Sequence, residues 1–371
     1  MTAEHDGPQP PAEWAQPADP VTRPTSNRRG PFFAAVGCIV ALVGLGAVLP
    51  VPYVRLAPGP VFDTLGSYDG KPLITITGTK TYPTTGQLDM TTVSEQDGQA
   101  GSLTLLSAVL SWFNKSYAVL PRDLIYPPNQ TPEQNQQQNA EEMTTSQSDA
   151  TIAAVNFLGI HYSTRVAVGS IVVGAPALGK LQAGDLITAV NGTAITTAQQ
   201  VGTLVRASPV GTKLTFKVTR QKALTTVDAT SAANPKDGTP YLGITVTDLP
   251  DLPFQVTFTL DQVGGPSAGL MFSLGIIDKL DQTEMARGRH IAGTGTIDPS
   301  GNVGPIGGII QKMAGARRDG ATIFLVPKDN CAEALTAVPE GLTVVRADSM
   351  SAAVGALRAP DGAALPTCPT S

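Results

Sequence analysis

The chain has 371 residues, of which 42% are hydrophobic and 5% aromatic, and its formal net charge at pH 7 is -5. This length allows two or three domains with packed cores. The mildly acidic balance gives no electrostatic reason to expect a nucleic-acid partner. The cysteines, Cys38, Cys331 and Cys368, form no CxxC motif and no Cys/His cluster, which argues against a structural zinc site. We predict no metal site and no cofactor.

The N-terminal region reads as a tail followed by a membrane anchor. Residues 1–30 are Pro-rich and polar, a composition typical of a disordered cytoplasmic tail. Residues 31–51 carry no charge and would span about 30 Å as a helix. Three arginines precede this run and only Arg55 follows it closely, so the positive-inside rule places the N-terminus in the cytoplasm. We predict a single-pass anchor in the cell membrane over 31–52, with the rest of the chain outside the cytoplasm. A cleaved signal peptide and a buried core helix are the alternatives.

Residues 57–159 form the first segment beyond the predicted anchor. Residues 73–95 alternate with period two around a Gly-containing turn, which indicates a strand hairpin. Residues 102–113, SLTLLSAVLSWF, indicate a helix. The Pro-, Gln- and Asn-rich stretch 127–142 indicates a mobile loop. Apolar residues at helical spacing follow it and predict a helix that stops at Gly159.

Residues 160–248 combine strand and helix patterns in a distinctive order. Asn191 and Gly192 make a favoured hairpin turn after the apolar strand DLITAV. A helix is predicted over 196–207, followed by an alternating strand over 212–220. Together with APALGKLQAGDLITAVNG, this order resembles the PDZ domain family.

The PDZ resemblance implies a small β-rich sandwich or barrel with helices. It also implies binding of extended C-terminal peptides, which such domains add to a sheet as a strand. Two segments are candidates for the carboxylate-binding loop: FLGI at 157–160 and YLGI at 241–244. The residues do not decide between them.

A partial phosphate-binding motif lies in the same region. Residues 174–180, GAPALGK, fit the first seven positions of G-x-x-x-x-G-K-[ST]. Leu181 stands where a Ser or Thr would hold magnesium, and Pro176 removes a backbone N–H from the loop. We therefore predict no nucleotide binding.

Ser267 stands in GGPSAG, at the head of an apolar run. Pro266 is a good first helical residue, and from Ala268 onward the run is apolar almost all round, which indicates a buried helix. Ser267 would then lie at a buried helix N-terminus, where free N–H groups favour negative charge. This setting suits an oxyanion on a substrate carbonyl. The alternative is a serine that only caps or packs.

Lys312 lies on a predicted helix that begins near Gly308. At about 100° per residue, Ile309, Met313 and neighbouring alanines share an apolar face, while Gln311 points away. Lys312 falls at the edge of this face. A partly desolvated lysine there has a lowered pKa and can act as a general base. The alternative is a solvated surface charge.

The pair of motifs resembles the proteolytic domain of Lon, a Ser–Lys peptidase. Lys312 of GPIGGIIQK follows Ser267 by 45 residues, and the match continues into RRDGATIFLVPKDN. The resemblance implies that Ser267 is the nucleophile, Lys312 the base and Thr294 a supporting residue that hydrogen-bonds the lysine. It assigns no role to Asp261 or Asp298. The residues QVGG before the serine depart from the family, so the substrate-facing wall can differ.

Neither His161 nor His290 is needed by such a dyad. The complete arrangement resembles the membrane-anchored PDZ–Lon-like proteases of bacteria, without the ATPase of Lon. It implies an α+β chain: one N-terminal transmembrane helix, a PDZ domain and a Lon-type proteolytic α/β domain over 250–358, with a tail over 359–371. The early segment 57–159 resembles the first part of the Lon-like fold, which would make the PDZ domain an insertion within it.

The predicted function is that of an ATP-independent, membrane-anchored serine endopeptidase. Its expected partners are protein or peptide substrates, C-terminal peptides at the PDZ domain, the membrane and possible further copies of the chain. A PDZ scaffold with an inactive protease domain is the alternative, and the intact Ser267, Lys312 and Thr294 argue against it. A trypsin-like protease would need a His/Asp/Ser triad and a GNSGG-type motif, which the chain lacks.

Cys331 and Cys368 would both lie in an oxidising compartment, where disulfides persist. Cys331 starts a predicted helix, and Cys368 lies in a Pro-containing tail without apolar periodicity. We predict a disulfide that ties the tail to the domain. The alternative is a buried Cys331 and a free Cys368 thiol.

Overall fold

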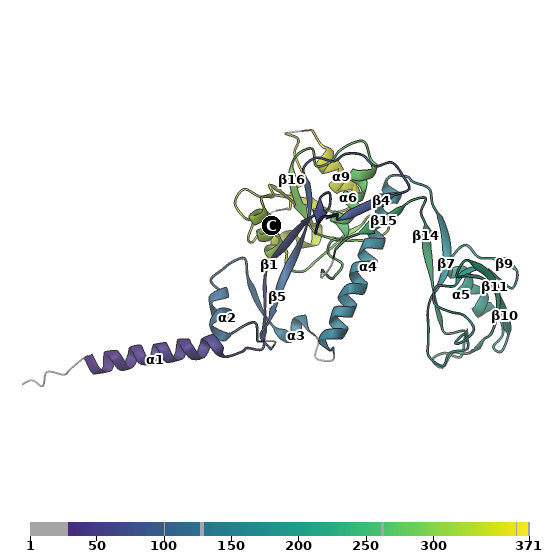
Figure 1. Cartoon of the computed structure of the whole chain (residues 1–371), viewed down its shortest axis with the longest axis horizontal. Coiled ribbons are helices and arrows are strands. Elements are labelled where there is room, and N and C mark those ends of the chain that lie inside the picture. The colour runs from purple at the N-terminus through teal and green to yellow at the C-terminus, as the bar shows by residue number, and fades with distance from the viewer. Residues whose placement is uncertain (1–28, 100, 127–129, 261–262, 361, 370–371) are drawn as a thin grey trace, which may run out of the picture.

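The computed structural model describes the whole chain except residues 1–28, 100, 127–129, 261–262, 361 and 370–371. It has three parts: a long helix α1 (Arg29–Val48), a mixed α/β body and a smaller β-rich unit. Figure 1 shows α1 projecting from one side of the body, with the β-rich unit on the opposite side.

The body is built on one mixed sheet. Its strand order is β20-β19-β16-β5-β1-β6. The strands are β1 (Tyr53–Asp63), β5 (Gln87–Asp97), β6 (Ala118–Pro121), β16 (His290–Gly293), β19 (Ile323–Pro327) and β20 (Thr343–Ala347). Strands β5, β16, β19 and β20 are parallel, whereas β1 is antiparallel to both β5 and β6. Early and late parts of the chain therefore share one sheet.

Two hydrophobic cores lie on the two faces of this sheet. On one face, Leu88 and Met90 of β5 join a core with α4 (Pro132–Phe157), α6 (Gly269–Leu280) and α9 (Met350–Arg358). On the other face, Ala292 of β16 packs with α7 (Ile309–Asp319) and α8 (Cys331–Ala334). The alternation of strand side chains between faces produces this division. Helix α6 is buried from Gly269 through Asp278, as its uniformly apolar sequence predicts.

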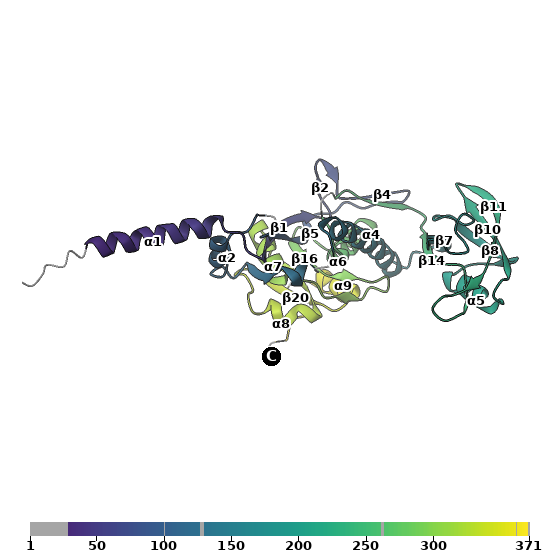
Figure 2. The same cartoon turned by 90° about the horizontal axis from the view of Figure 1, so that it is seen from below.

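The β-rich unit is a second sheet with a core of its own. Its strand order is β11-β10-β8-β7-β14. The strands are β7 (Ser163–Ile171), β8 (Leu186–Val190), β10 (Lys213–Arg220), β11 (Ala223–Thr230) and β14 (Ile244–Asp251), accompanied by α5 (Ala198–Ala207). Ser163 and Asp251, its first and last strand residues, are register partners. The unit is thus inserted into the body at one point, and Figures 1 and 2 show it set apart.

The remaining elements are short. They are β2 (Ser67–Tyr68), β3 (Lys71–Pro72), β4 (Ile74–Thr77), α2 (Leu105–Ser111), α3 (Arg122–Ile125), β9 (Thr193–Ala194), β12 (Ala232–Ala233), β13 (Pro240–Tyr241), β15 (Gln255–Phe258), β17 (Thr296–Ile297), β18 (Val303–Gly304) and a 3₁₀ turn (Lys328–Asn330).

The predicted hairpin over 73–95 is wrong. Its two strands are β4, which pairs with β15, and β5, which pairs with β1 and β16. Strand alternation identifies strands but not their partners.

The predicted mobile loop over 127–142 is also wrong for most of its length. Helix α4 begins at Pro132, and residues 127–129 lie outside the described part of the chain. Thr131 caps the helix, because its side chain accepts from the backbone N–H of Gln134, whose own side chain accepts from Thr131 N–H. Hydrogen bonds between side chains four residues apart, such as the one from Gln138 to Glu142, stabilise the polar first turns of α4.

The predicted anchor over 31–52 is helical only as far as Val48. Pro50 and Pro52 follow, and proline lacks the N–H that would continue the helix. Within the described residues, no helix combines the length and the apolar character needed to cross a membrane.

Candidate active site

Ser267 lies in the short connection that leads into α6. The helix begins at Gly269 with Ala268 as its N-cap, so Pro266 is not the first helical residue and Ser267 is not the cap. Two contacts with α4 hold the connection. Gly265 N–H donates to Asn139 O at 2.9 Å, and Ser146 Oγ donates to Pro266 O at 3.0 Å. The serine is thereby positioned by α4, through Asn139 in the stretch predicted as a loop and Ser146 in the stretch predicted as a helix.

Lys312 lies in the first turn of α7 and reaches Ser267. Its Nζ is 2.8 Å from Ser267 Oγ and 3.0 Å from Thr294 Oγ1. Thr294, fully buried after β16, donates from Oγ1 to Ser267 O at 3.0 Å. Lysine, threonine and serine therefore form one hydrogen-bonded group across α7, β16 and the α6 connection.

Lys312 is more deeply buried than its predicted place at a helix edge implies. Its residue exposure is 3%, and so is that of Gln311, which was expected to point away. The reason is that α7 packs against β1 as well as against the rest of the sheet. A Cβ on Gly315 would lie only 3.3 Å from Gly59 O of β1, which shows how closely the two approach.

Burial changes the chemistry of the lysine. It lowers the pKa of Lys312 from its ordinary 10.5 to about 7, because the charged ammonium loses its hydration. Its hydrogen-bond partners in the structure are hydroxyl groups rather than carboxylates. A large fraction of Lys312 is thus neutral near pH 7, and a neutral amine can accept the Ser267 proton.

Ser267 lines two cavities. One, of about 610 Å³, is lined by Ser267, Lys312, residues 90–95 of β5 and residues of α4. The other, of about 390 Å³, is lined by Ser267, Thr296 and residues 305–307. An extended chain passing through both would bring a backbone carbonyl to Ser267.

The other polar residues singled out in the sequence lie elsewhere or have other roles. Asp298 shapes the turn between β17 and β18, where Oδ1 accepts from the backbone N–H of Ser300 and Asn302. Asp261 lies outside the described residues. His290 pairs with the buried Asp89 through Nε2, and His161 is exposed. The structure brings neither histidine to Ser267. Sequence reasoning missed Asn139 and Ser146, because their segment carries no motif.

The structure separates the two candidates for a carboxylate-binding loop in the β-rich unit. YLGI leads into β14, which begins at its Ile244 and is the edge strand that lies beside α5. Asp248 of β14 also accepts from the Ala198 N–H of α5 at 2.6 Å. FLGI instead ends α4, and Phe157 packs against the core of the body. A peptide added between β14 and α5 would therefore meet YLGI.

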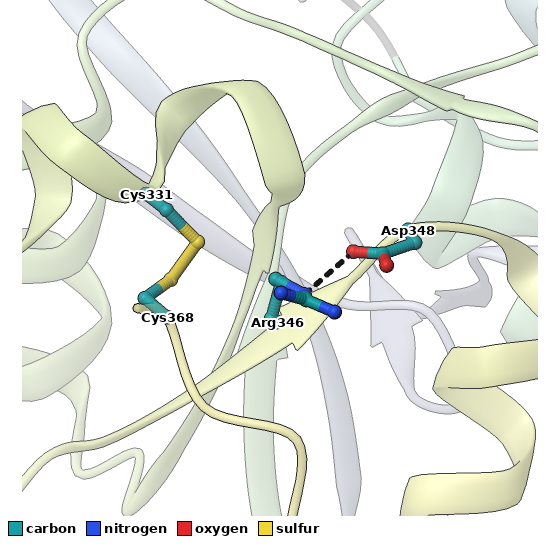
Figure 3. Close-up of a disulfide and its surroundings, with 4 residues drawn as sticks. All are labelled: Cys331, Arg346, Asp348 and Cys368. Carbon is teal, nitrogen blue, oxygen red and sulfur yellow. Dashed lines mark ion pairs between the residues drawn. A yellow bond between two sulfur atoms is a disulfide. The ribbon is translucent and has the colours of Figure 1, made fainter. Parts of the chain in front are cut away.

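The structure joins Cys331 and Cys368 as a disulfide (Figure 3). Cys331 starts α8, and Cys368 is 6% exposed within the same core. The tail is held at a second point, where Arg346 N–H of β20 donates to Pro366 O at 2.9 Å. Arg346 also forms an ion pair with Asp348 next to the disulfide.

Comparison with known proteins finds a family match within each folded part. Residues 262–354 match the Lon protease (S16) C-terminal proteolytic domain, and residues 168–220 match the PDZ domain. Lon protease 1 of Bacillus subtilis (strain 168) is 38% identical over 89 residues, which are 23% of this chain and 11% of that protein. Lon protease 2 of Herpetosiphon aurantiacus is 40% identical over 90 residues, again 23% and 11%. The chain thus spans about a tenth of these relatives.

Among solved structures, the PDZ domain of the SdrC-like protein Lin2157 from Listeria innocua is 31% identical to this chain. The alignment covers 22% of this chain and 90% of that one, with a TM-score of 0.21. The corresponding domain of Lmo2051 from Listeria monocytogenes is 32% identical over 22% of this chain and 85% of that one, with the same TM-score of 0.21.

Proposed function

We propose that this chain, which carries a Lon-type proteolytic domain and a PDZ domain, is an ATP-independent serine endopeptidase with a Ser–Lys dyad. The observation that carries the proposal is the 2.8 Å approach of Lys312 Nζ to Ser267 Oγ, where burial lowers the pKa of the lysine to about 7. A serine hydroxyl is a weak nucleophile unless a neighbouring base removes its proton. Lys312 is the base placed to do so.

Thr294 orients the base. A neutral amine has two N–H donors and one lone pair. One N–H donates to Thr294 Oγ1, whose own proton goes to Ser267 O. With this N–H engaged, the lone pair can face Ser267 Oγ, 2.8 Å from Nζ. Thr294 is thus a positioning residue, and the hydroxyl proton of Ser267 passes to Lys312 Nζ as Oγ attacks the peptide carbonyl.

The later steps use the same two residues. Negative charge develops on the carbonyl oxygen, and the backbone N–H groups at the start of α6, next to Ser267, are suited to stabilise it. The Lys312 ammonium then gives its proton to the leaving amine, and the peptide bond breaks to leave an acyl group on Ser267. Water attacks this ester while Lys312 again takes a proton, and the free serine is restored.

A substrate would lie extended along β5. Strand β16 pairs with β5 only from Gln87 to Met90, whereas β5 runs on to Asp97 and lines the larger cavity. Main-chain groups on this side of β5 are available to a peptide added as a strand. The PDZ domain, with α5 and β14 flanking its groove, would bind a separate peptide segment or a partner.

ATP independence rests on the sequence. The partial motif at 174–180 lacks the Ser or Thr that holds magnesium. Its segment in the structure is a loop of the β-rich unit that leads to β8. Cleavage measured without nucleotide, and again with ATP and magnesium, tests this point: dependence on ATP would refute it.

We also propose that the chain acts outside the cytoplasm and at a membrane. The disulfide favours an oxidising compartment, because cytoplasmic thiols are kept reduced. Large apolar side chains are exposed on α1 and just after α2, including Phe33 at 67% and Trp112 at 68%, which favours an apolar surrounding. Two measurements test this proposal: cell fractionation, which locates the protein, and thiol titration of the unreduced, denatured protein, which shows whether Cys331 and Cys368 are bonded. Cytosolic protein with reactive Cys331 and Cys368 would refute the proposal.

The peptidase itself is tested with an unstructured protein such as casein. Wild type should cleave it, while Ser267→Ala and Lys312→Met should each lose nearly all activity, because the two residues act as one unit. Ser300→Ala and Lys328→Met, which change the same residue types away from the cavities, are the controls. Full activity in either dyad variant would refute the mechanism. A wild-type protein that binds peptides without cleaving them would instead be a scaffold.

A further inference from the structure

Two carboxylates face the cleft that holds the dyad. Among the described residues that line the larger cavity, the charged side chains are Glu95, Glu142 and Lys312. The second cavity that Ser267 borders is lined by uncharged residues. The charged side chains of the described cleft therefore lie in the larger cavity, along β5 and α4.

The carboxylates stand at two depths along this cavity. Glu142 is half-buried on α4, one turn before Ser146, which bonds the residue preceding Ser267. One helical turn corresponds to about 5 Å. Glu95 is exposed on β5, four residues beyond Thr91, whose Oγ1 donates to Gly293 O beside Thr294. Four strand residues span about 13 Å. An extended substrate would pass both positions.

Neither carboxylate has a cationic partner in the described structure. Glu95 accepts a hydrogen bond from Tyr126 Oη at 2.7 Å, and Glu142 accepts one from Gln138 Nε2 at 2.9 Å. These neutral donors orient the carboxylates but do not cancel their charge. The neighbouring Asp97, by contrast, is paired with Arg122 at 3.0 Å. Lys312 offsets only part of this charge, because its burial disfavours the charged form.

We propose that this cleft selects peptide substrates with a lysine or arginine on the side of the scissile bond that lies along β5 and α4. A cationic side chain there would pair with Glu142 when close to Ser267, or with Glu95 when farther away. An acidic side chain would meet like charge in a partly desolvated groove. The inference rests on the proposed peptidase function and adds a substrate class to it.

The selection is tested with the full chain and internally quenched peptides at low salt. Each peptide set shares one sequence and carries Lys, Met or Glu at a single scanned position. We expect kcat/KM to follow Lys over Met over Glu at two positions or more, with a Lys-to-Glu ratio of about five to ten. High salt should reduce this ratio.

Replacing each glutamate with glutamine, which has the same shape but no charge, shows which carboxylate is responsible for the preference for lysine. Glu142→Gln should reduce the ratio at the position nearer the scissile bond, and Glu95→Gln at the more distant one. Glu141→Gln is the matched control: it changes the neighbouring exposed carboxylate of α4, which lines neither cavity, and should leave both ratios as in wild type.

The outcomes separate this inference from the peptidase proposal. Equal cleavage of Lys and Glu peptides, or ratios that Glu142→Gln and Glu95→Gln do not change, would overturn the charge selection while leaving the peptidase intact. If wild type does not cleave the Met peptide, or Ser267→Ala cleaves it equally well, the dyad fails, and the selection fails with it.

Discussion

Replacing Lys312 with methionine should make the protein more stable at pH 7 and less stable at pH 10. Lys312 is 3% exposed, and its pKa is lowered to about 7 from an ordinary 10.5. Between these values the unfolded chain binds a proton that the folded protein does not hold. Folding stability must then rise with pH across this window. Methionine has a similar length and no charge, so it removes this dependence.

The size of the effect follows from the two pKa values. Each pH unit between them corresponds to about 1.4 kcal/mol. The buried lysine therefore costs about 4 kcal/mol at pH 7, about 2 kcal/mol at pH 9 and less than about 1 kcal/mol at pH 10. Methionine also loses the hydrogen bonds to Ser267 and Thr294, each worth about 1 kcal/mol. The net gain is about 2 kcal/mol at pH 7 and becomes a loss of about 1 kcal/mol at pH 10.

Differential scanning calorimetry at pH 7, 8, 9 and 10 measures this difference. The β-rich unit has a separate core, so its transition is an internal reference that the substitution should not move. Lys328→Met, at an exposed lysine, is the control and should show no change of sign. A stability difference that stays constant from pH 7 to 10, or a variant already less stable at pH 7, would refute the buried neutral amine.

Three further predictions concern activity, the tail and the inserted unit. Because Lys312 must be neutral to act as a base, kcat/KM should rise about tenfold from pH 6 to 8 and then level off; a flat profile would contradict this. The bond between Cys331 and Cys368 closes 37 residues, so reductant should lower stability by up to about 4 kcal/mol in the chain-entropy model, and an unchanged Tm on reduction would count against it. Ser163 and Asp251 are register partners about 5 Å apart, so a short Gly/Ser linker that joins them can replace the inserted unit. This deletion variant should fold and still cleave short peptides; loss of folding would show that the body needs the inserted unit.

Local signals in the sequence were enough to find the elements that carry the proposed chemistry. The apolar run after Ser267 predicts a helix buried on every side, and α6 is buried in this way. The glycine-led segment before Lys312 predicts a helix from about Gly308, where α7 has its N-cap. Such signals depend on residues close together in the chain, namely apolar periodicity and helix ends, which tertiary context seldom reverses.

Only the tertiary structure decided what surrounds those elements. The Gln- and Asn-rich composition from Pro132 onward predicts a loop, yet these residues form the start of α4. The N-cap, the side-chain pairs along the helix and the contacts with the α6 connection together outweigh the weak helix propensity of these residues. The sequence predicts that Lys312 lies at a helix edge, yet its side chain is buried in a helix that packs against β1, some 250 residues earlier in the chain. Burial, and with it the lowered pKa of Lys312, depends on atoms contributed by segments far apart in sequence. The periodicity of one helix carries no information about them.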